Sequence, residues 1–183
     1  MCLEQKKYEL LKDDTVNHNG RTLYRIKALI TFGTVVAGEL GGYIETEKNL
    51  DHSGNAWVCG NARVFEDARV YEDAEVFGNA EVFGNARVRG YARVFEDAEV
   101  YGNAQVRSFA FIYERKMIFW ASNVGSENGT LTVFNGKDGL IVTRGCFTGT
   151  VDEFLSKSKE LHDDKTHNEY KLLIEVAKSR ILG

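Results

Sequence analysis

The chain has 183 residues, of which 43% are hydrophobic and 27% are charged, as in ordinary folded globular proteins, so wholesale disorder is excluded. Its formal net charge of −4 argues against a nucleic-acid backbone as the main ligand, because proteins that bind one usually present a basic surface. The three cysteines, Cys2, Cys59 and Cys146, lack the spacing of a disulfide framework or a zinc site, so we expect a reducing cytoplasm.

Residues 1–40 are expected to form a β-hairpin that caps the region after it. Apolar stretches lie on both sides of Asn19-Gly20, a dipeptide that favours a two-residue hairpin turn. No apolar run approaches the roughly 20 residues that span a bilayer. The opening MCLEQKKYELL also has acidic residues where a signal peptide would be apolar, so we expect no membrane segment and no secretion.

Residues 41–113 are expected to form a repetitive β domain. Ile44 and Leu50 lie twelve and six residues before Ala56, which predicts imperfect first coils beginning near Gly41 or Gly42. Ten six-residue repeats then follow without a break from Gly54 to Tyr113: GNAWVC, GNARVF, EDARVY, EDAEVF, GNAEVF, GNARVR, GYARVF, EDAEVY, GNAQVR and SFAFIY.

Each repeat combines a short strand with a corner. An alanine lies two residues before a β-branched residue, as Ala62 and Val64 do, so both side chains point to one face, which must be the core. The Gly-Asn or Glu-Asp pair supplies turn chemistry, since Gly and Asn tolerate positive φ and Asp bonds its own backbone. Strands and corners of constant length must coil into a solenoid.

The GNARV repeats resemble those of hexapeptide-repeat proteins. That resemblance implies a three-sided, left-handed parallel β-helix with three repeats per turn, in which residues 18 apart in sequence stack about 4.8 Å apart. Arg63 would then face Glu81, and Glu75 would face Arg93. The outward side chains would form three columns: Phe65, Phe83 and Tyr101; Cys59, Phe77, Phe95 and Tyr113; and Tyr71, Arg89 and Arg107. We take all of these except Cys59 as the candidate binding residues.

Two of these columns are aromatic and one is basic. Because a monomer seldom exposes several stacked phenylalanines, we expect the aromatic columns to be covered. The chain's own terminal segments, another copy of the chain and a foreign partner are the three candidates for that cover.

Residues 114–183 are expected to form a small α+β domain. Three strands, KMIFWASNV, TLTVF and GLIVTRG, are separated by turn signals such as Asn128-Gly129. Thr150 and Glu153 match a capping box that opens a first helix. Apolar residues at helical spacing from Tyr170 to Ile181 predict a second helix, whose apolar stripe we interpret as core.

The YELL and GELGGYI stretches before the GNARV array also resemble uncharacterised proteins of bacteriophage and prophage genomes. This resemblance covers nearly the whole chain. It implies a role in the cytoplasm of an infected bacterial cell, but it brings no established chemistry.

An enzyme is the less favoured interpretation. Many hexapeptide-repeat proteins are trimeric acyltransferases with a histidine base, but here His18, His52, His162 and His167 all lie outside the regular repeats. His52 is expected to cap the coils, and Cys59 to be a packed thiol. The acidic pairs occupy corner positions and are interpreted as turns, not as metal ligands. We expect no catalytic residue, no metal and no cofactor.

Binding is therefore the predicted function. The first hypothesis is a non-enzymatic phage or prophage protein that inhibits or bridges a host bacterial protein, such as a defence protein, through the β-helix surface. The alternatives are a self-assembling scaffold, with a trimer favoured, and a hexapeptide-type acyltransferase. Direct binding of nucleic acid is not expected, because the repeats hold six arginines against nine carboxylates.

Overall fold

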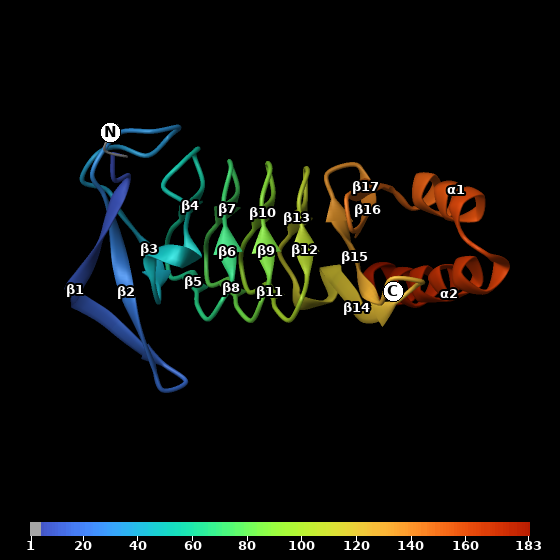
Figure 1. Ribbon diagram of the computed structural model, residues 1–183. Helices are drawn as coiled ribbons and strands as arrows, with labels where there is room; N and C mark the ends of the chain where they lie inside the picture. Colours follow the sequence, from blue (N-terminus) through green and yellow to red (C-terminus); the bar gives the residue numbers. More distant parts are fainter. Residues whose placement is uncertain (1–4) are drawn as a thin grey trace.

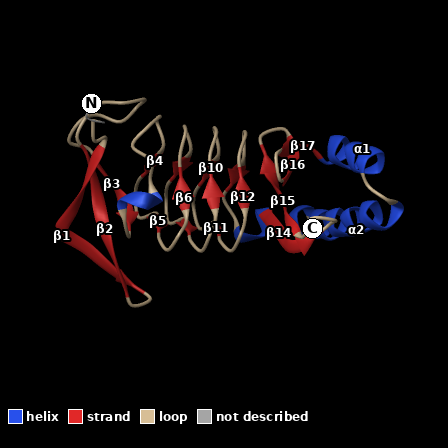
Figure 2. Ribbon diagram, in the orientation of Figure 1, coloured by secondary structure: helices blue, strands red, loops and turns tan. Residues whose placement is uncertain are grey.

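The computed structural model describes residues 5–183, so Cys2 and the first residues of the predicted region 1–40 lie outside it. Figure 1 shows an elongated molecule, with a hairpin at one end, stacked coils in the middle and helices at the other end. The chain is mainly β, as Figure 2 shows, and the predicted fold class is confirmed. No helix in the described part of the chain is long and apolar enough to cross a membrane.

The N-terminal hairpin forms where the sequence predicts it. Strands β1 (Tyr8–His18) and β2 (Arg21–Ala28) are antiparallel and meet at a turn in which Asn19 and Gly20 have φ of 51° and 80°. Two successive residues with positive φ are the signature of a type I′ turn, which matches the twist of paired strands. Strand β2 pairs with β3 (Leu40–Ile44), which continues into the coils, so the hairpin extends one sheet of the solenoid.

The solenoid is built from two-residue strands in three parallel sheets. The sheets follow the orders β3-β5-β8-β11, β4-β7-β10-β13 and β6-β9-β12. The left-handed sense of the coil stays a prediction. The ten strands are β4 (Trp57–Val58), β5 (Arg63–Val64), β6 (Arg69–Val70), β7 (Glu75–Val76), β8 (Glu81–Val82), β9 (Arg87–Val88), β10 (Arg93–Val94), β11 (Glu99–Val100), β12 (Gln105–Val106) and β13 (Phe111–Ile112).

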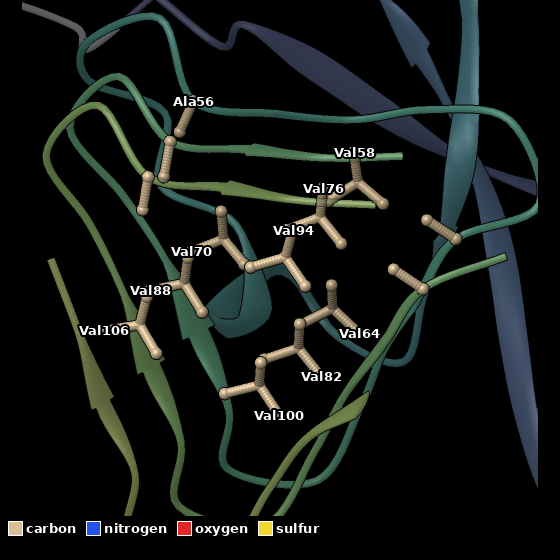
Figure 3. Close-up of a cluster of buried hydrophobic side chains, with 14 of the residues drawn as sticks. Ala56, Val58, Val64, Val70, Val76, Val82, Val88, Val94, Val100 and Val106 are labelled. Atoms are coloured by element: carbon tan, nitrogen blue, oxygen red, sulfur yellow. The ribbon is translucent and has the colours of Figure 1, made fainter. Parts of the chain in front are cut away.

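The inner residues of the repeats make a continuous core. All ten alanines and the β-branched residue two positions after each have at most 1% of their surface exposed. Figure 3 shows valines from the three sheets pointing toward the axis of the coil. The predicted alternation of inward and outward residues is thus confirmed, and it leaves the outward positions free to differ from coil to coil.

The first coil is two residues longer than the rest. Trp57 pairs with Glu75, 18 residues later, as in every regular coil, but Tyr43 pairs with Arg63, 20 residues later. The sequence correctly predicted that Ile44 and Leu50 are buried. Their expected register with Ala56 was wrong, because the extra residues fall between Leu50 and Ala56 and put both side chains in the valine columns.

The C-terminal domain has one strand more than the sequence predicted. A sheet of β14 (Ile118–Val124), β15 (Gly129–Gly136) and β16 (Gly139–Arg144) is completed by β17 (Phe147–Thr150), an antiparallel neighbour of β16. The three-strand prediction was therefore wrong: β17 is short and has two threonines and a glycine, so it carries little apolar signal.

Two helices cover this sheet and form a second core with it. Helix α1 (Val151–Leu161) opens at the predicted capping box, where the Glu153 amide donates to Thr150 Oγ1 at 3.3 Å and the Thr150 amide to the Glu153 carboxylate at 2.7 Å. Helix α2 (Asp164–Leu182) buries Tyr170, Ile174 and Ala177, as its spacing predicted.

Both ends of the solenoid are closed by polar side chains. At the N-terminal end, beside the short helix η1 (Glu47–Asn49), Lys7 Nζ donates to the carbonyl oxygen of Ala56 at 2.8 Å, and the buried Asn49 amide donates to those of Glu66 and Ala68 at 2.9 Å. At the other end, after the short helix η2 (Arg115–Met117), Thr132 Oγ1 accepts a hydrogen bond from the Gln105 amide at 3.1 Å. Closure of both ends satisfies polar backbone that would otherwise invite strand addition.

Candidate binding surface

The first predicted column is a closed stack. The rings of Phe65, Phe83 and Tyr101 lie nearly parallel, with centroids 5.1 and 4.9 Å apart. His18 from the tip of the hairpin lies 5.2 Å from the Phe65 ring, and Trp120 from β14 lies 4.5 Å from Tyr101. Phe65 is only 4% exposed. The chain's own flanking segments contact both ends of this column, which is one of the three covers considered from the sequence, although Tyr101 keeps 41% of its surface exposed.

The second predicted column is half-buried and has a cation beside it. Phe77 and Phe95 stack at 4.8 Å, and Tyr113 continues the column at 5.5 Å from Phe95. The guanidinium of Arg93 lies 5.0 Å from the centre of the Phe77 ring and donates to Glu75 at 3.1 Å. Burial raises the pKa of the Cys59 thiol at the head of this column, which fits a packed thiol better than a nucleophile.

The third predicted column is basic. Arg89 lies 5.9 Å over the Tyr71 ring and is paired with the Glu72 carboxylate at 3.2 Å. The next residue in this column, Arg107, donates a hydrogen bond to the carbonyl oxygen of Gly145 in the C-terminal domain. Burial, together with the neighbouring charge of Arg89, lowers the pKa of the Arg107 guanidinium.

A fourth column, which the sequence reasoning missed, is the most exposed. Tyr91 and Phe109 stack with centroids 5.3 Å apart and planes 9° from parallel, and they are 60% and 55% exposed. They lie at a corner where earlier coils have Asn55 and Asp73, joined by a hydrogen bond of 2.8 Å. The signal was present in the sequence, since both aromatics replace the second corner residue at a separation of 18.

Grooves lie on both sides of this aromatic corner, by which we mean Tyr91 and Phe109. One, of about 440 Å³, runs between Tyr91 and the segment around Val35, with Trp57 and Phe77 on its floor. The other, of about 240 Å³, lies between Phe109 and the loop that joins β15 to β16. The exposed rings therefore stand between two concave surfaces that a partner could fill.

The acidic corners are occupied by backbone hydrogen bonds. Glu66 and Glu72 both adopt positive φ, near 60°, and their carboxylates accept from the amides of Gly84 and Gly90 in the next coil at 2.9 Å. These bonds give the carboxylates of two of the three Glu-Asp repeats a structural role at the corner. Across residues 5–183, no three His, Cys, Asp or Glu side chains gather as a metal site requires.

His52 helps to close the N-terminal end of the coil. It lies within the lengthened corner of the first coil, stacks on Tyr8 at 4.3 Å and accepts a hydrogen bond from the Lys7 amide at 3.2 Å. Burial lowers the pKa of its imidazole, which favours the neutral form. Because Nδ1 accepts this hydrogen bond, the neutral ring carries its proton on Nε2, a buried atom without a partner among the described residues, so neither nitrogen is free to accept a proton from a substrate.

Comparison with models of known protein families gives no match, and no curated protein matches the chain.

Proposed function

We propose that this protein is a non-enzymatic protein-binding module whose anchor is the aromatic corner. The observation that carries the proposal is the exposure of Tyr91 and Phe109, 60% and 55%, at a position where the fold itself needs only a small polar residue. Neither ring contributes to the solenoid core. Large, rigid aromatic side chains supply most of the binding energy at many protein interfaces.

The surroundings of the corner suit such an anchor. The half-buried Phe77 and Phe95 lie on the adjoining sheet, and Glu39, Asp73 and Arg93 line the nearer groove. An apolar centre with a polar rim is the usual composition of a protein interface. The partner would cover the rings and fill the grooves beside them.

The proposed setting is the cytoplasm of a bacterial host, and the proposed target is a host protein that is inhibited or bridged, a defence protein being one candidate. The resemblance to bacteriophage and prophage proteins supports this setting. Cys59 and Cys146 are free thiols, which accords with a reducing compartment.

Self-assembly into a trimer is the second candidate, and charge favours it. The groove beside Tyr91 carries Glu39 and Asp73 in excess of the paired Glu75 and Arg93, whereas the sheet on the other side of the same corner carries Arg69 and Arg87. Two unlike, complementary surfaces on one chain permit head-to-tail contacts, which close into a ring when the rotation fits.

A capture experiment separates the two candidates. The tagged protein is exposed to bacterial lysate in three forms: wild type, Tyr91→Ser/Phe109→Ser, and Leu172→Ser/Val176→Ser. The last removes two apolar side chains of α2, in the C-terminal domain, that are 60% and 53% exposed. We expect a bacterial protein to be captured by the wild type and the α2 variant but not by the corner variant.

Equal capture by all three forms would refute the anchor. Sedimentation velocity on the purified proteins measures their oligomeric state and so tests the second candidate, self-assembly. A wild-type trimer that becomes a monomer in the corner variant, together with no captured protein, would support self-assembly instead.

A further inference from the structure

Two arginines on one face of the solenoid lack the charge partner that other stacked residues have. In the parallel ladder of β6 and β9, Arg69 lies directly opposite Arg87, and both are exposed. Two other stacked pairs join opposite charges: Arg63 pairs with Glu81 at 2.8 Å, and Arg93 with Glu75 at 3.1 Å. Glu81 also lies opposite Glu99, but each of these glutamates has an arginine partner, Arg63 and Arg115. Among the described residues, no carboxylate comes within 4.0 Å of either Arg69 or Arg87, by contrast with those pairs.

This arrangement costs stability unless an anion is supplied. Stacked coils are about 4.8 Å apart, and like charges directly opposite each other on neighbouring strands are destabilising. A glutamate at either position would complete the ladder, as it does for Arg63 and Arg93. Within the described chain, neither of these two arginines has a neighbouring carboxylate to balance its charge.

The same face carries further positive charge. Arg89 and Arg107 follow two residues after Arg87 and Gln105 and point to the same side of the sheet. Only Arg89 has a carboxylate partner, Glu72, among the described residues. We call these four arginines, Arg69, Arg87, Arg89 and Arg107, the arginine face; it stands out on a chain whose net charge is −4.

The chemistry and shape of this face narrow the class of ligand. Guanidinium groups bind carboxylates through paired hydrogen bonds, and two of them about 4.8 Å apart can share one carboxylate. None of the grooves described above includes Arg69 or Arg87, and a small ligand usually needs a concave site.

We propose that the arginine face docks an acidic segment of a protein partner, with Arg69 and Arg87 sharing one of its carboxylates. This inference rests on the proposed function and specifies that the partner's binding segment is acidic. Arg89 and Arg107 lie two residues before Tyr91 and Phe109, so the arginine face and the aromatic corner adjoin. The partner's acidic segment would bind beside the apolar group that covers the corner.

The test uses Arg87→Glu, which breaks the face without weakening the fold, because it gives Arg69 an acidic neighbour. The probe is a fluorescent hexaglutamate peptide, and binding is measured by anisotropy at low and high salt. Lys171→Glu, an exposed position on α2, is the matched control for the change in net charge. We expect the wild type and the control to bind equally and Arg87→Glu to bind at least about tenfold more weakly, with high salt weakening all binding.

Equal binding by all three proteins, or no binding by the wild type, would overturn the proposal. Tighter binding of inorganic pyrophosphate or of an oligothymidylate than of the peptide would overturn it too, in favour of a phosphate ligand. The Tyr91→Ser/Phe109→Ser variant tests the proposed function separately. If it binds hexaglutamate like the wild type and still captures the bacterial protein, the aromatic anchor fails while the arginine face stands. If the corner variant loses capture but keeps the peptide, and Arg87→Glu loses the peptide and captures less of the bacterial protein, both hold.

Discussion

The carboxylate of Glu72 accepts a hydrogen bond of 2.9 Å from the backbone amide of Gly90, one coil further along the solenoid. Glu72 itself has φ of 61°, a conformation that costs a non-glycine residue about 1 kcal/mol or more. The bond to the next coil offsets that cost. The same bond from Glu66 to the Gly84 amide supports the corner one repeat earlier, so at these two corners Glu takes the place of Gly with a compensating contact.

Replacement of Glu72 tests this explanation. Glu72→Ala keeps the unfavourable φ and loses the hydrogen bond, so we expect a loss of about 1 kcal/mol in the free energy of unfolding. Glu72→Gly also loses the bond but relieves the strain, so it should be the more stable of the two, as measured by urea unfolding. Glu96→Ala is the control, since Glu96 has positive φ but no such bond within the described chain. An alanine variant at 72 as stable as the wild type would contradict the account.

Core side chains of the solenoid should tolerate neither a smaller nor a larger replacement. Val82 and Ala80, neighbours in a middle coil, are both fully buried. Val82→Ala should lower the free energy of unfolding by about 2 kcal/mol through lost burial and a cavity, and Ala80→Val by about 1 to 3 kcal/mol through overpacking. Chemical denaturation measures both. A stabilising Ala80→Val would mean that the coil is wider than described.

Charge reversal should have opposite effects on the two ladders. Arg87→Glu places an acid beside Arg69 and is expected to raise the free energy of unfolding by a few tenths to about 1 kcal/mol. Arg63→Glu instead faces Glu81, with which Arg63 now pairs at 2.8 Å, and should be destabilising. Urea unfolding at low salt compares them. Destabilisation by both would show that the Arg69–Arg87 contact is not repulsive.

Lys7 gives the stability a specific pH dependence. Burial lowers the pKa of this ammonium to about 8, against the opposing charges of Asp51 and Asp73. Between about pH 8 and the ordinary lysine pKa near 10.4, the unfolded chain therefore binds the proton and the folded chain does not. Stability contributed by Lys7 must rise with pH through this window.

The comparison is with Lys7→Met, which cannot titrate. The free energy of unfolding of the wild type relative to this variant should increase as the pH is raised from about 8 to about 10, and stay level below that range. Urea titrations at several pH values supply the difference. A level difference throughout would place Lys7 in water rather than at the end of the coil.

The regular part of the fold could be predicted from the sequence because every repeat has the same pattern of core, outward and corner residues. Ala62 and Val64 alternate with outward residues, and each corner pair turns the chain into the next strand. The core positions and the outward columns could therefore be predicted. The hairpin at Asn19-Gly20 and the helix start at Thr150 were equally local signals. All three depend on neighbours in sequence.

The features that could not be predicted from the sequence depend on the register of the first coil or on the exposure of side chains in the folded protein. The lengthened first coil moved Ile44 and Leu50 into the valine columns, and no local pattern marks the two extra residues. Phe65 was predicted to point outward, but in the structure His18 at the tip of the hairpin packs against it. Tyr91 and Phe109 occupy corner positions in the repeat pattern, and only the structure shows that they are largely exposed. The candidate surface therefore moved from the predicted columns to the corner beside them.

Site-specific photocrosslinking in bacterial cells tests the aromatic corner most directly. Benzoylphenylalanine is placed at Tyr91 in one form of the protein and at Val176, on α2, in another. We predict that illumination gives one defined adduct with a bacterial protein from position 91 and none from position 176. No adduct from position 91, or the same adduct from both positions, would contradict the claim that this corner is the binding surface.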